Sequence, residues 1–309
     1  MESDLIAYLR ERIGPHPLLR LGIGDDAAVL DMAGVERCVM TVDMLMDGVD
    51  FELAKIDPRR AGRKALAVNL SDLAAMAAAP LAGVVALALP RVGGMELAVA
   101  LYEGLLPLAE RFDVAIAGGD TNSWDGPLAV SVTLLGRVTA HGPLLRSGAE
   151  PGDEILVTGA LGGSILGRHL DFEPRVEEAL QLNAGFALHA GIDVSDGLLL
   201  DLSRLAAESR CGAVVDLESV PVHADAVRLA ARDGPGGRTP LEHALADGED
   251  FELILAVPPE EAKRLLERQP LDAPLVRIGR FIDEPGLWQE FVGGARLPLA
   301  LRGYLHEFT

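Results

Sequence analysis

The sequence predicts an α/β (α+β) fold that is divided into two domains. Segments typical of strands alternate with segments typical of helices along the chain, which is the pattern of sheets layered with helices. The chain has 309 residues, which is long for one domain and sufficient for two. A turn-rich stretch at residues 147–153, SGAEPGD, lies between the halves. We therefore expect one domain at residues 1–146 and another at residues 147–309.

The first half predicts a long helix that opens at Asp57-Pro58, because proline suits the first helical position. Residues 73–90 carry no charge, but Pro80 and Gly83 interrupt them. We expect the end of a buried helix, a turn and a buried strand there, and no membrane span. The expected helices are 3–14, 57–79 and 95–112; the expected strands are 28–31, 38–44, 81–89, 113–117 and 128–138, with a polar loop at 118–126.

The second half predicts strands that end in tight, polar turns. Residues 189–205, HAGIDVSDGLLLDLSRL, indicate a strand, a sharp turn and a helix. The remaining expected elements are a strand at 154–159, a glycine loop at 160–164, a strand at 213–217, a surface loop at 232–240, a loop leading into a strand at 247–257 and a helix at 260–269.

Composition excludes several classes of protein. The formal net charge of −20 disfavours nucleic-acid binding, which depends on basic surface meeting phosphates. Two cysteines, Cys38 and Cys211, form no CxxC pair, so we expect a reduced, cytoplasmic protein without a disulfide framework. The first residues, MESDLIAYLRERIG, resemble a charged amphipathic helix and not a signal peptide.

Acidic residues recur where strands end or turns begin. Isolated ionised carboxylates among apolar neighbours are costly, and carboxylates that converge raise one another's pKa. Divalent cations relieve both effects, and Asp, backbone carbonyls and water suit Mg²⁺. Each acid could instead be an ordinary cap or turn residue, but their number favours a shared metal site. These acids are Asp25, Asp26, Asp43, Asp72, Asp120, Asp193, Asp196, Glu249 and Asp250.

Other chemistries have less support. DVSDG lacks the first glycine of a G-x-S-x-G nucleophile elbow, which disfavours a serine hydrolase. No Walker A loop is present, and no H-x-x-x-H pair suggests zinc. Metal-bridged phosphoryl transfer fits best, because it needs positioning and cations and no protein nucleophile.

One short repeat stands out. DGVDFEL at 47–53 and DGEDFEL at 247–253 differ at a single position. The flanking residues do not match, so we interpret the repeat as coincidence.

Seven motifs taken together resemble the thiamine-monophosphate kinase family, in the superfamily of aminoimidazole ribonucleotide synthetase. The resemblance covers nearly the whole chain. The motifs, in chain order, are GIGDDAAVL, TVDMLMDGVDF, KALAVNLSDLAAM, AGGDTN, LLRSGAEPGD, IDVSDGLLLDL and GEDFEL.

The resemblance implies Mg²⁺-dependent transfer of the ATP γ-phosphate to thiamine monophosphate, which yields thiamine diphosphate. It also implies a homodimer, in which the N-terminal sheets pack into a barrel spanning both subunits, and a C-terminal α/β domain that completes the nucleotide and substrate site. The implied Mg²⁺ ligands are Asp26, Thr41, Val42, Asp43, Asp72, Asp120, Asp193 and Asp196; the implied ATP contacts are Tyr102, Gly119, Asp120, Arg146 and Ser195; the implied substrate contacts are Asp50, Glu249 and Tyr304.

Two positions depart from the family pattern. Asp50 stands where members typically have a substrate-contacting histidine, and Val42 stands where they tend to have a hydroxyl residue, so that Val42 offers only its carbonyl. Two alternatives therefore remain: a non-catalytic nucleotide- or metal-binding scaffold, and an enzyme of the superfamily that acts on another phosphorylated acceptor.

Overall fold

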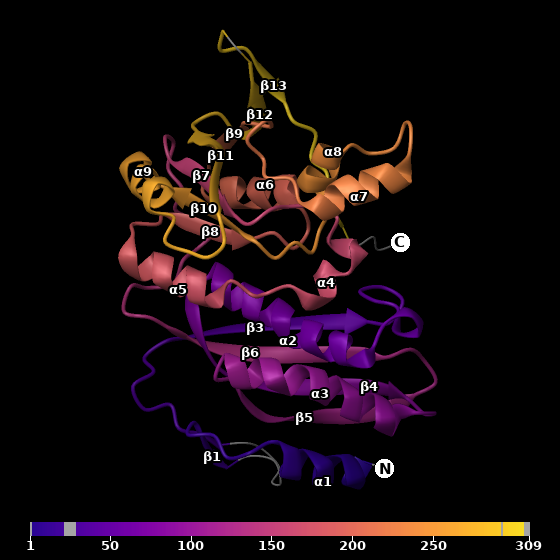
Figure 1. Ribbon diagram of the computed structural model, residues 1–309. Coiled ribbons are helices and arrows are strands. Elements are labelled where there is room, and N and C mark those ends of the chain that lie inside the picture. Colours follow the sequence, from indigo (N-terminus) through magenta and orange to yellow (C-terminus); the bar gives the residue numbers. More distant parts are fainter. Residues whose placement is uncertain (1, 22–28, 292, 306–309) are drawn as a thin grey trace. The chain divides into compact units, whose positions relative to one another are not determined.

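The computed structural model describes residues 2–21, 29–291 and 293–305. The chain divides into two compact units. Unit 1 comprises residues 1–73 and 78–140, and unit 2 comprises residues 74–77 and 141–309. Each unit combines a sheet with covering helices, as the predicted α/β (α+β) class requires (Figure 1).

Unit 1 is built on a four-stranded sheet in the order β3-β6-β4-β5. Strand β4 pairs antiparallel with β6 and parallel with β5, and β6 also pairs antiparallel with β3. Its helices are α1 (Glu2–Arg12), α2 (Pro58–Ala75) and α3 (Gly94–Arg111), and its strands are β1 (Leu19–Leu21), β2 (Val29–Leu30), β3 (Cys38–Met46), β4 (Ala78–Pro90), β5 (Ala115–Trp124) and β6 (Ala129–Val138).

Helices α2 and α3 pack closely against each other along one side of this sheet (Figure 1). Two glycines permit this contact. A Cβ atom on Gly62 would lie 1.9 Å from the Leu101 carbonyl oxygen, and one on Gly104 would lie 1.8 Å from that of Arg59. Larger residues at either position would force the helices apart.

The opposite face of the sheet is open over β3. Along this strand, Met40, Val42 and Met44 are 72%, 61% and 63% exposed, whereas Thr41, Asp43 and Leu45 turn inward. The alternation follows from the pleat, which sends successive side chains to opposite faces.

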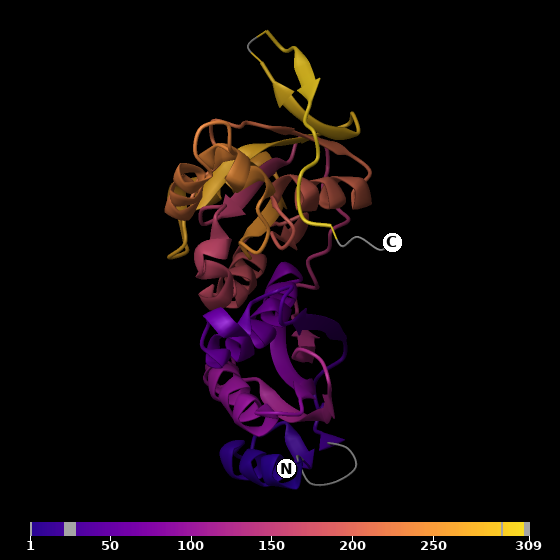
Figure 2. The same ribbon diagram turned by 90° about the vertical axis from the view of Figure 1, so that its right-hand side faces the viewer.

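Unit 2 is built on a seven-stranded sheet in the order β13-β12-β9-β11-β7-β10-β8, and only its β9–β12 pair is parallel. Figure 2 shows helices on both sides of this sheet. Its helices are α4 (Arg168–Asp171), α5 (Val176–Gly185), α6 (Leu198–Glu208), α7 (Ala224–Asp233), α8 (Pro240–Ala246) and α9 (Pro259–Arg268), and its strands are β7 (Glu154–Thr158), β8 (Ala190–Asp193), β9 (Gly212–Val215), β10 (Leu253–Val257), β11 (Leu275–Ile282), β12 (Gly286–Glu290) and β13 (Arg296–Pro298). Its core joins α6 to the sheet through residues such as Leu198, Leu202, Ile155 and Ile278, all fully buried.

Most predicted elements are confirmed, with two corrections. The helix predicted at 57–79 ends at Ala75, because Ala77 adopts a left-handed φ of 48° and the chain turns into β4. The polar stretch 118–126, predicted as a loop, is mostly strand, since residues 118–124 continue β5 and pair with β4. The prediction was wrong because β5 is an edge strand. Such a strand pairs on one side only, so it can carry the polar side chains that are typical of a loop. Among the described residues, no helix has the length and apolar character needed to cross a membrane.

Candidate functional site

An acidic cluster lies between β3 and α2 in unit 1. Asp43 and Thr41 point inward from β3, and the Thr41 hydroxyl donates a hydrogen bond to Asp72 on α2. Strand alternation places residues 41 and 43 on one face, and α2 covers that face. The structure thus brings together three of the predicted Mg²⁺ ligands.

The surroundings of Asp43 disfavour the ionised form of its carboxyl group. Burial, together with the neighbouring carboxylates of Asp72 and Asp50, raises the pKa of Asp43 to about 7. No positive side chain among the described residues lowers it. A divalent cation would supply the missing positive charge.

Two buried oxygens in this region also fit a cation. Within the described part of the chain, Asp43 Oδ2 and Asn69 Oδ1 have no hydrogen-bond partner. The residues present therefore fit Mg²⁺, which prefers such oxygen ligands. The ligand set is incomplete, however, because no three or more Asp, Glu, His or Cys side chains in the described ranges come together closely enough to hold a metal. Asp25 and Asp26, predicted to contribute here, lie outside the described residues.

Asp50 closes a turn beside this cluster. Its Oδ2 accepts a hydrogen bond of 2.6 Å from the Met46 N–H, and its carbonyl accepts one of 2.9 Å from the Lys64 ammonium. The Asp50 side chain therefore braces its own turn. Val42 points to the opposite, open face, as expected if only its carbonyl were to serve a metal.

Gly119 and Asp120 lie on β5, at the other edge of the same sheet. Strand β6 and strand β4 separate β5 from β3, which corresponds to about 14 Å at the usual strand spacing. Asp120 is exposed, and within this chain it does not join the Asp43 cluster. Gly119 lies against β4, where a Cβ atom would be 1.9 Å from the Val85 carbonyl oxygen.

Tyr102, predicted to contact ATP, lies on the buried side of α3. It is 3% exposed, and burial raises the pKa of its phenol to about 12.

In unit 2, the predicted residues gather around the turn between β8 and α6. Asp193 ends β8 and is buried, and Gly197 precedes α6. The Asp201 carboxylate accepts hydrogen bonds from the Asp196 and Gly197 amides at 2.9 and 3.1 Å. Burial raises the pKa of Asp201 to about 6 against the opposing effect of these amide bonds and of Arg204.

Two further segments join this turn. The Glu249 amide donates to the Ser195 carbonyl at 2.7 Å, and the Tyr304 amide donates to the Asp196 carbonyl at 2.9 Å. Ser195, Asp196, Glu249 and Tyr304 are therefore brought together through their main chains. Arg146 is exposed, and its carbonyl accepts a hydrogen bond of 2.8 Å from Ser209, at the end of α6.

Family models match most of the chain. A model described as AIR synthase related protein, N-terminal domain, matches residues 24–138, and the corresponding C-terminal domain matches residues 150–287. The thiamine-monophosphate kinase of Rhodopirellula baltica is 47% identical over 316 residues, which cover 100% of this chain and 98% of the relative.

The chain belongs to the thiamine-monophosphate kinase family. The enzyme of Bacillus subtilis, with the same name, is 35% identical over 302 residues and covers 90% of each chain. The crystal structure of thiamine-monophosphate kinase from Stenotrophomonas maltophilia K279a superposes with a TM-score of 0.79 at 37% identity, covering 92% of this chain and 95% of that one. Escherichia coli HypE superposes with a TM-score of 0.79 at 20% identity and covers 97% of each chain, which shows the shared fold alone.

The arginine partners of this family member's acidic loop were not predicted from sequence. The sequence predicts Asp250 only as one of several acids at turns, and it assigns no role to Glu252. In the structure, Arg168 Nη2 lies 2.8 Å from Asp250 Oδ1, and Arg175 Nη2 lies 2.7 Å from Glu252 Oε1. Both arginines come from the α4–α5 region, and no local sequence pattern links them to residues 250 and 252.

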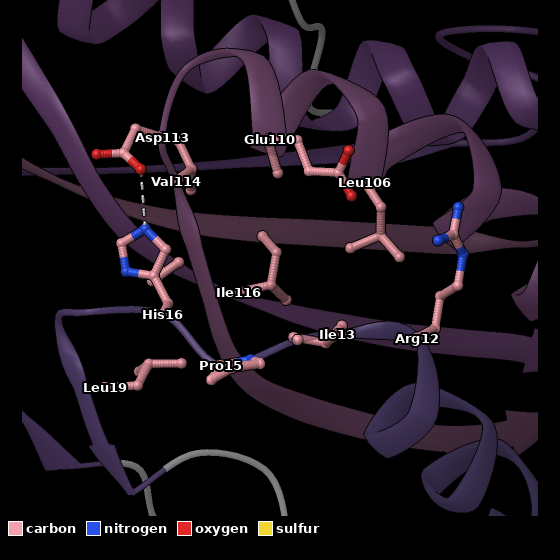
Figure 3. Close-up of a pocket in the computed structure, with 13 residues that line it drawn as sticks. Arg12, Ile13, Pro15, His16, Leu19, Leu106, Glu110, Asp113, Val114 and Ile116 are labelled. Atoms are coloured by element: carbon pink, nitrogen blue, oxygen red, sulfur yellow. Dashed lines mark hydrogen bonds and ion pairs between the residues drawn. The ribbon is translucent and has the colours of Figure 1, made fainter.

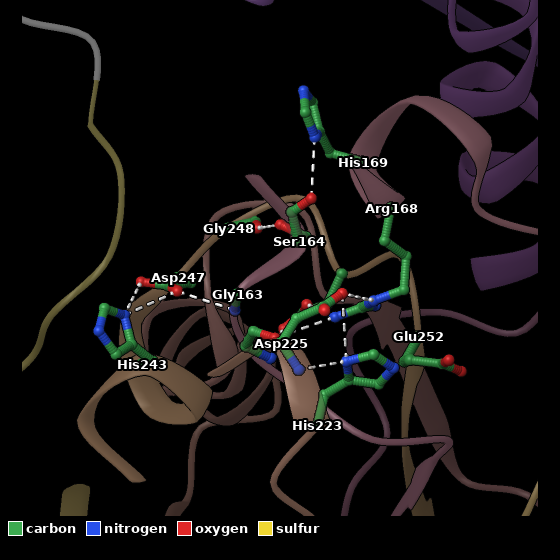
Figure 4. Close-up of polar contacts among 12 residues, drawn as sticks. Gly163, Ser164, Arg168, His169, His223, Asp225, His243, Asp247, Gly248 and Glu252 are labelled. Carbon is green, nitrogen blue, oxygen red and sulfur yellow. Dashed lines mark hydrogen bonds and ion pairs between the residues drawn. The ribbon is translucent and has the colours of Figure 1, made fainter. Parts of the chain in front are cut away.

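Neighbouring polar contacts fix the same loop. Figure 4 shows Asp247 between His243 and the Gly163 amide, which donates to Asp247 Oδ2 at 2.9 Å. Ser164 donates to the Gly248 carbonyl at 2.7 Å. The glycine pair at 162–163 therefore binds carboxylates of the chain itself.

A cavity of about 300 Å³ in unit 1 lies apart from the predicted residues. It is lined from one side by residues 12–16 and Leu19, and from the other by parts of α3 and β5 (Figure 3). His16 reaches Asp113 at its edge, at 3.2 Å. None of the residues predicted for thiamine-monophosphate kinase chemistry lines it.

Proposed function

We propose that this chain transfers the γ-phosphate of ATP to the phosphate of thiamine monophosphate, which yields thiamine diphosphate. The observation that carries the proposal is the Asp43 carboxylate: burial and the neighbouring acids Asp72 and Asp50 raise its pKa to about 7, and its Oδ2 has no hydrogen-bond partner within the described part of the chain. Relatives that match 100% and 90% of the chain bear the name of this activity.

Several Mg²⁺ ions would neutralise the phosphate oxygens during in-line transfer. We assign their binding to Thr41, Asp43 and Asp72, with the Val42 carbonyl and the remaining predicted aspartates. Asp43 would remain ionised with the cations bound, and the Thr41 hydroxyl would keep Asp72 oriented. No protein nucleophile is required.

We assign nucleotide and substrate contacts to both units. The exposed guanidinium of Arg146 is suited to phosphate oxygens in an otherwise acidic chain. Gly119, Asp120 and Ser195 would contact ATP, and Asp50, Glu249 and Tyr304 would contact thiamine monophosphate. Tyr102 is 3% exposed, so we assign it to the packing of α3 and not to a direct ATP contact. Residues 1–146 would thus form the ATP, Mg²⁺ and dimerisation domain, and residues 147–309 would complete the nucleotide and substrate site.

We further propose a homodimer in which the open face of the unit 1 sheet packs against a second copy. The support is the run of exposed apolar side chains on β3, with Met40 at 72% and Met44 at 63%, joined by Val84 on β4 at 42%. Apolar patches of this kind mark interaction surfaces. We place the protein in the cytoplasm, in line with its two unpaired cysteines, Cys38 and Cys211.

The test is ADP release by the purified protein with ATP and Mg²⁺, with and without thiamine monophosphate. ADP that appears only with thiamine monophosphate, together with thiamine diphosphate, supports the proposal. Release that ignores thiamine monophosphate would indicate another phosphorylated acceptor. Bound nucleotide without release would indicate the scaffold alternative.

A further inference from the structure

The loop that carries Glu249 runs beside the Ser195 turn and is bonded to it. Glu249 N–H donates to the Ser195 carbonyl at 2.7 Å, and Phe251 N–H donates to the Val194 carbonyl at 2.8 Å. Val194 N–H donates back to the Glu252 carbonyl at 2.8 Å. The position of Glu249 relative to Ser195 therefore depends on the conformation of residues 249–251.

That conformation is unfavourable for its residues. Glu249 has φ of 60° and Phe251 has φ of 52°, both in the left-handed region. Side chains with a Cβ atom crowd the following carbonyl there, so such residues persist only where their surroundings hold them. Contacts from outside residues 249–251 must therefore hold these two φ angles.

Asp250, between these two residues, provides the anchor. Its side chain is 0% exposed. Oδ2 accepts a hydrogen bond of 2.7 Å from the Gly162 amide, and Oδ1 accepts one of 2.8 Å from Arg168 Nη2. Arg168 Nη2 also donates to the Gly162 carbonyl at 3.1 Å, so the three residues close a ring of contacts. Figure 4 shows Arg168 extending from its helix towards Asp225, whose Oδ2 lies 3.9 Å from Arg168 Nε.

We infer that Arg168 is a positioning residue for the phosphorylated substrate, acting through Asp250 to hold Glu249 beside Ser195. The inference rests on the proposed function, because it concerns the substrate contact assigned to Glu249. Arg168 itself need not touch the substrate.

Arg175 offers a matched control. It is 19% exposed where Arg168 is 20% exposed, and it too pairs with a buried acid of the same segment, Glu252. Glu252 also accepts a hydrogen bond of 2.6 Å from Thr158, at the end of β7. Arg175 therefore braces the start of β10 and not the left-handed turn.

The test is a double-mutant cycle on KM for thiamine monophosphate. Arg168→Met should raise this KM about ten-fold, the loss expected for one charge-assisted hydrogen bond, with kcat and KM for ATP little changed. In a Glu249→Gln background the same substitution should change KM less than about two-fold, because residues that act as a unit are not additive. Arg175→Met should lower the melting temperature without raising KM, and Arg168→Lys should give an intermediate KM.

An equal KM effect of Arg168→Met in both backgrounds, or no effect in either, would overturn the inference. If the wild-type protein does not use thiamine monophosphate, the proposed function fails. Hydrogen exchange then tests separately whether Arg168 holds the conformation of residues 249–251. Faster exchange of the Glu249 and Phe251 amides in Arg168→Met, or in Arg168→Lys if the first variant does not fold, supports it. Unchanged exchange in the folded variant overturns it.

Discussion

Residues 47–53 and 247–253 have nearly the same sequence but differ in how their acids are compensated. In DGVDFEL, Asp50 accepts a bond from the Met46 amide and Asp47 accepts one from the Leu53 amide, so the turn is closed by its own main chain. In DGEDFEL, Asp250 and Glu252 pair with Arg168 and Arg175, which come from elsewhere in unit 2. Nearly the same seven residues therefore have different bonding partners in the two places.

The same contrast separates the acidic regions around these turns. Burial, together with the carboxylate neighbours Asp72 and Asp50, raises the pKa of Asp43, near the first turn, to about 7. Asp250, in the second, has a pKa that burial likewise raises to about 7, but there Arg168 and the Gly162 amide oppose the increase. Arg168 thus compensates the charge of Asp250, whereas no arginine or lysine in the described part of the chain opposes the raised pKa of Asp43, which suits Asp43 to a cation.

The largest expected effect is on turnover, from a substitution at Asp43. Asp43→Asn should lower turnover about 10³-fold, because it removes charge that would hold Mg²⁺ and no core packing. Its free energy of unfolding without Mg²⁺ should match or exceed that of the wild type, since carboxylate repulsion is reduced. Steady-state kinetics and urea unfolding measure the two quantities. Wild-type turnover in this variant would contradict the assignment of Asp43 to Mg²⁺ binding.

A substitution in the Arg168–Asp250 pair should lower the stability of the protein. Arg168→Met should lower the free energy of unfolding at pH 8 by roughly 2–4 kcal/mol, because it leaves the Asp250 carboxylate buried without its ion pair. Urea unfolding measures the loss, and Arg277→Met is the control, because Arg277 is 38% exposed and pairs with Glu154 at 2.6 Å. A loss of unfolding free energy no larger than that of the control would mean that the Gly162 amide alone is sufficient to stabilise the buried Asp250 carboxylate.

The loss of stability in Arg168→Met should depend on pH through the ionisation of Asp250. Asp250 has a pKa raised to about 7 in the folded protein, and Arg168→Met should raise it further by removing an opposing positive charge. Above pH 7 the wild type ionises while the variant retains its proton, so the folded variant binds more protons than the folded wild type. The stability deficit should therefore grow as pH rises from 6 to 9. A deficit that shrinks over this range would contradict the sign.

The smallest expected effect is on stability, from a substitution of Asp50 in the turn at residues 47–53. Asp50→His loses the bond from the Met46 amide and should cost about 1 kcal/mol of stability. Turnover should be retained and thiamine monophosphate binding tightened, since a histidine repels the substrate phosphate less than a carboxylate does. Kinetics and calorimetric binding check both; loss of activity would show that the Asp50 turn has a role of its own.

Local chemistry made much of the fold and part of the site predictable. Pro58 predicts the start of α2, and residues 38–44 predict the strand β3, whose pleat puts Thr41 and Asp43 on one face. The sequence did not reveal that 118–124 extends β5, because a polar edge strand resembles a loop in composition. Nor did it reveal the pairing of Arg168 with Asp250, which are 82 positions apart. Long-range pairing depends on topology, and only the folded sheet supplies it.

The most direct test of cation binding is the anomalous scattering of Mn²⁺ in crystals of the wild-type protein and of Asp43→Asn. Mn²⁺ takes the same oxygen ligands as Mg²⁺. We predict a manganese peak within coordination distance of the Asp43 carboxylate in the wild type and its loss in the variant. A wild-type crystal soaked with Mn²⁺ and nucleotide that shows no peak at Asp43 would contradict the account.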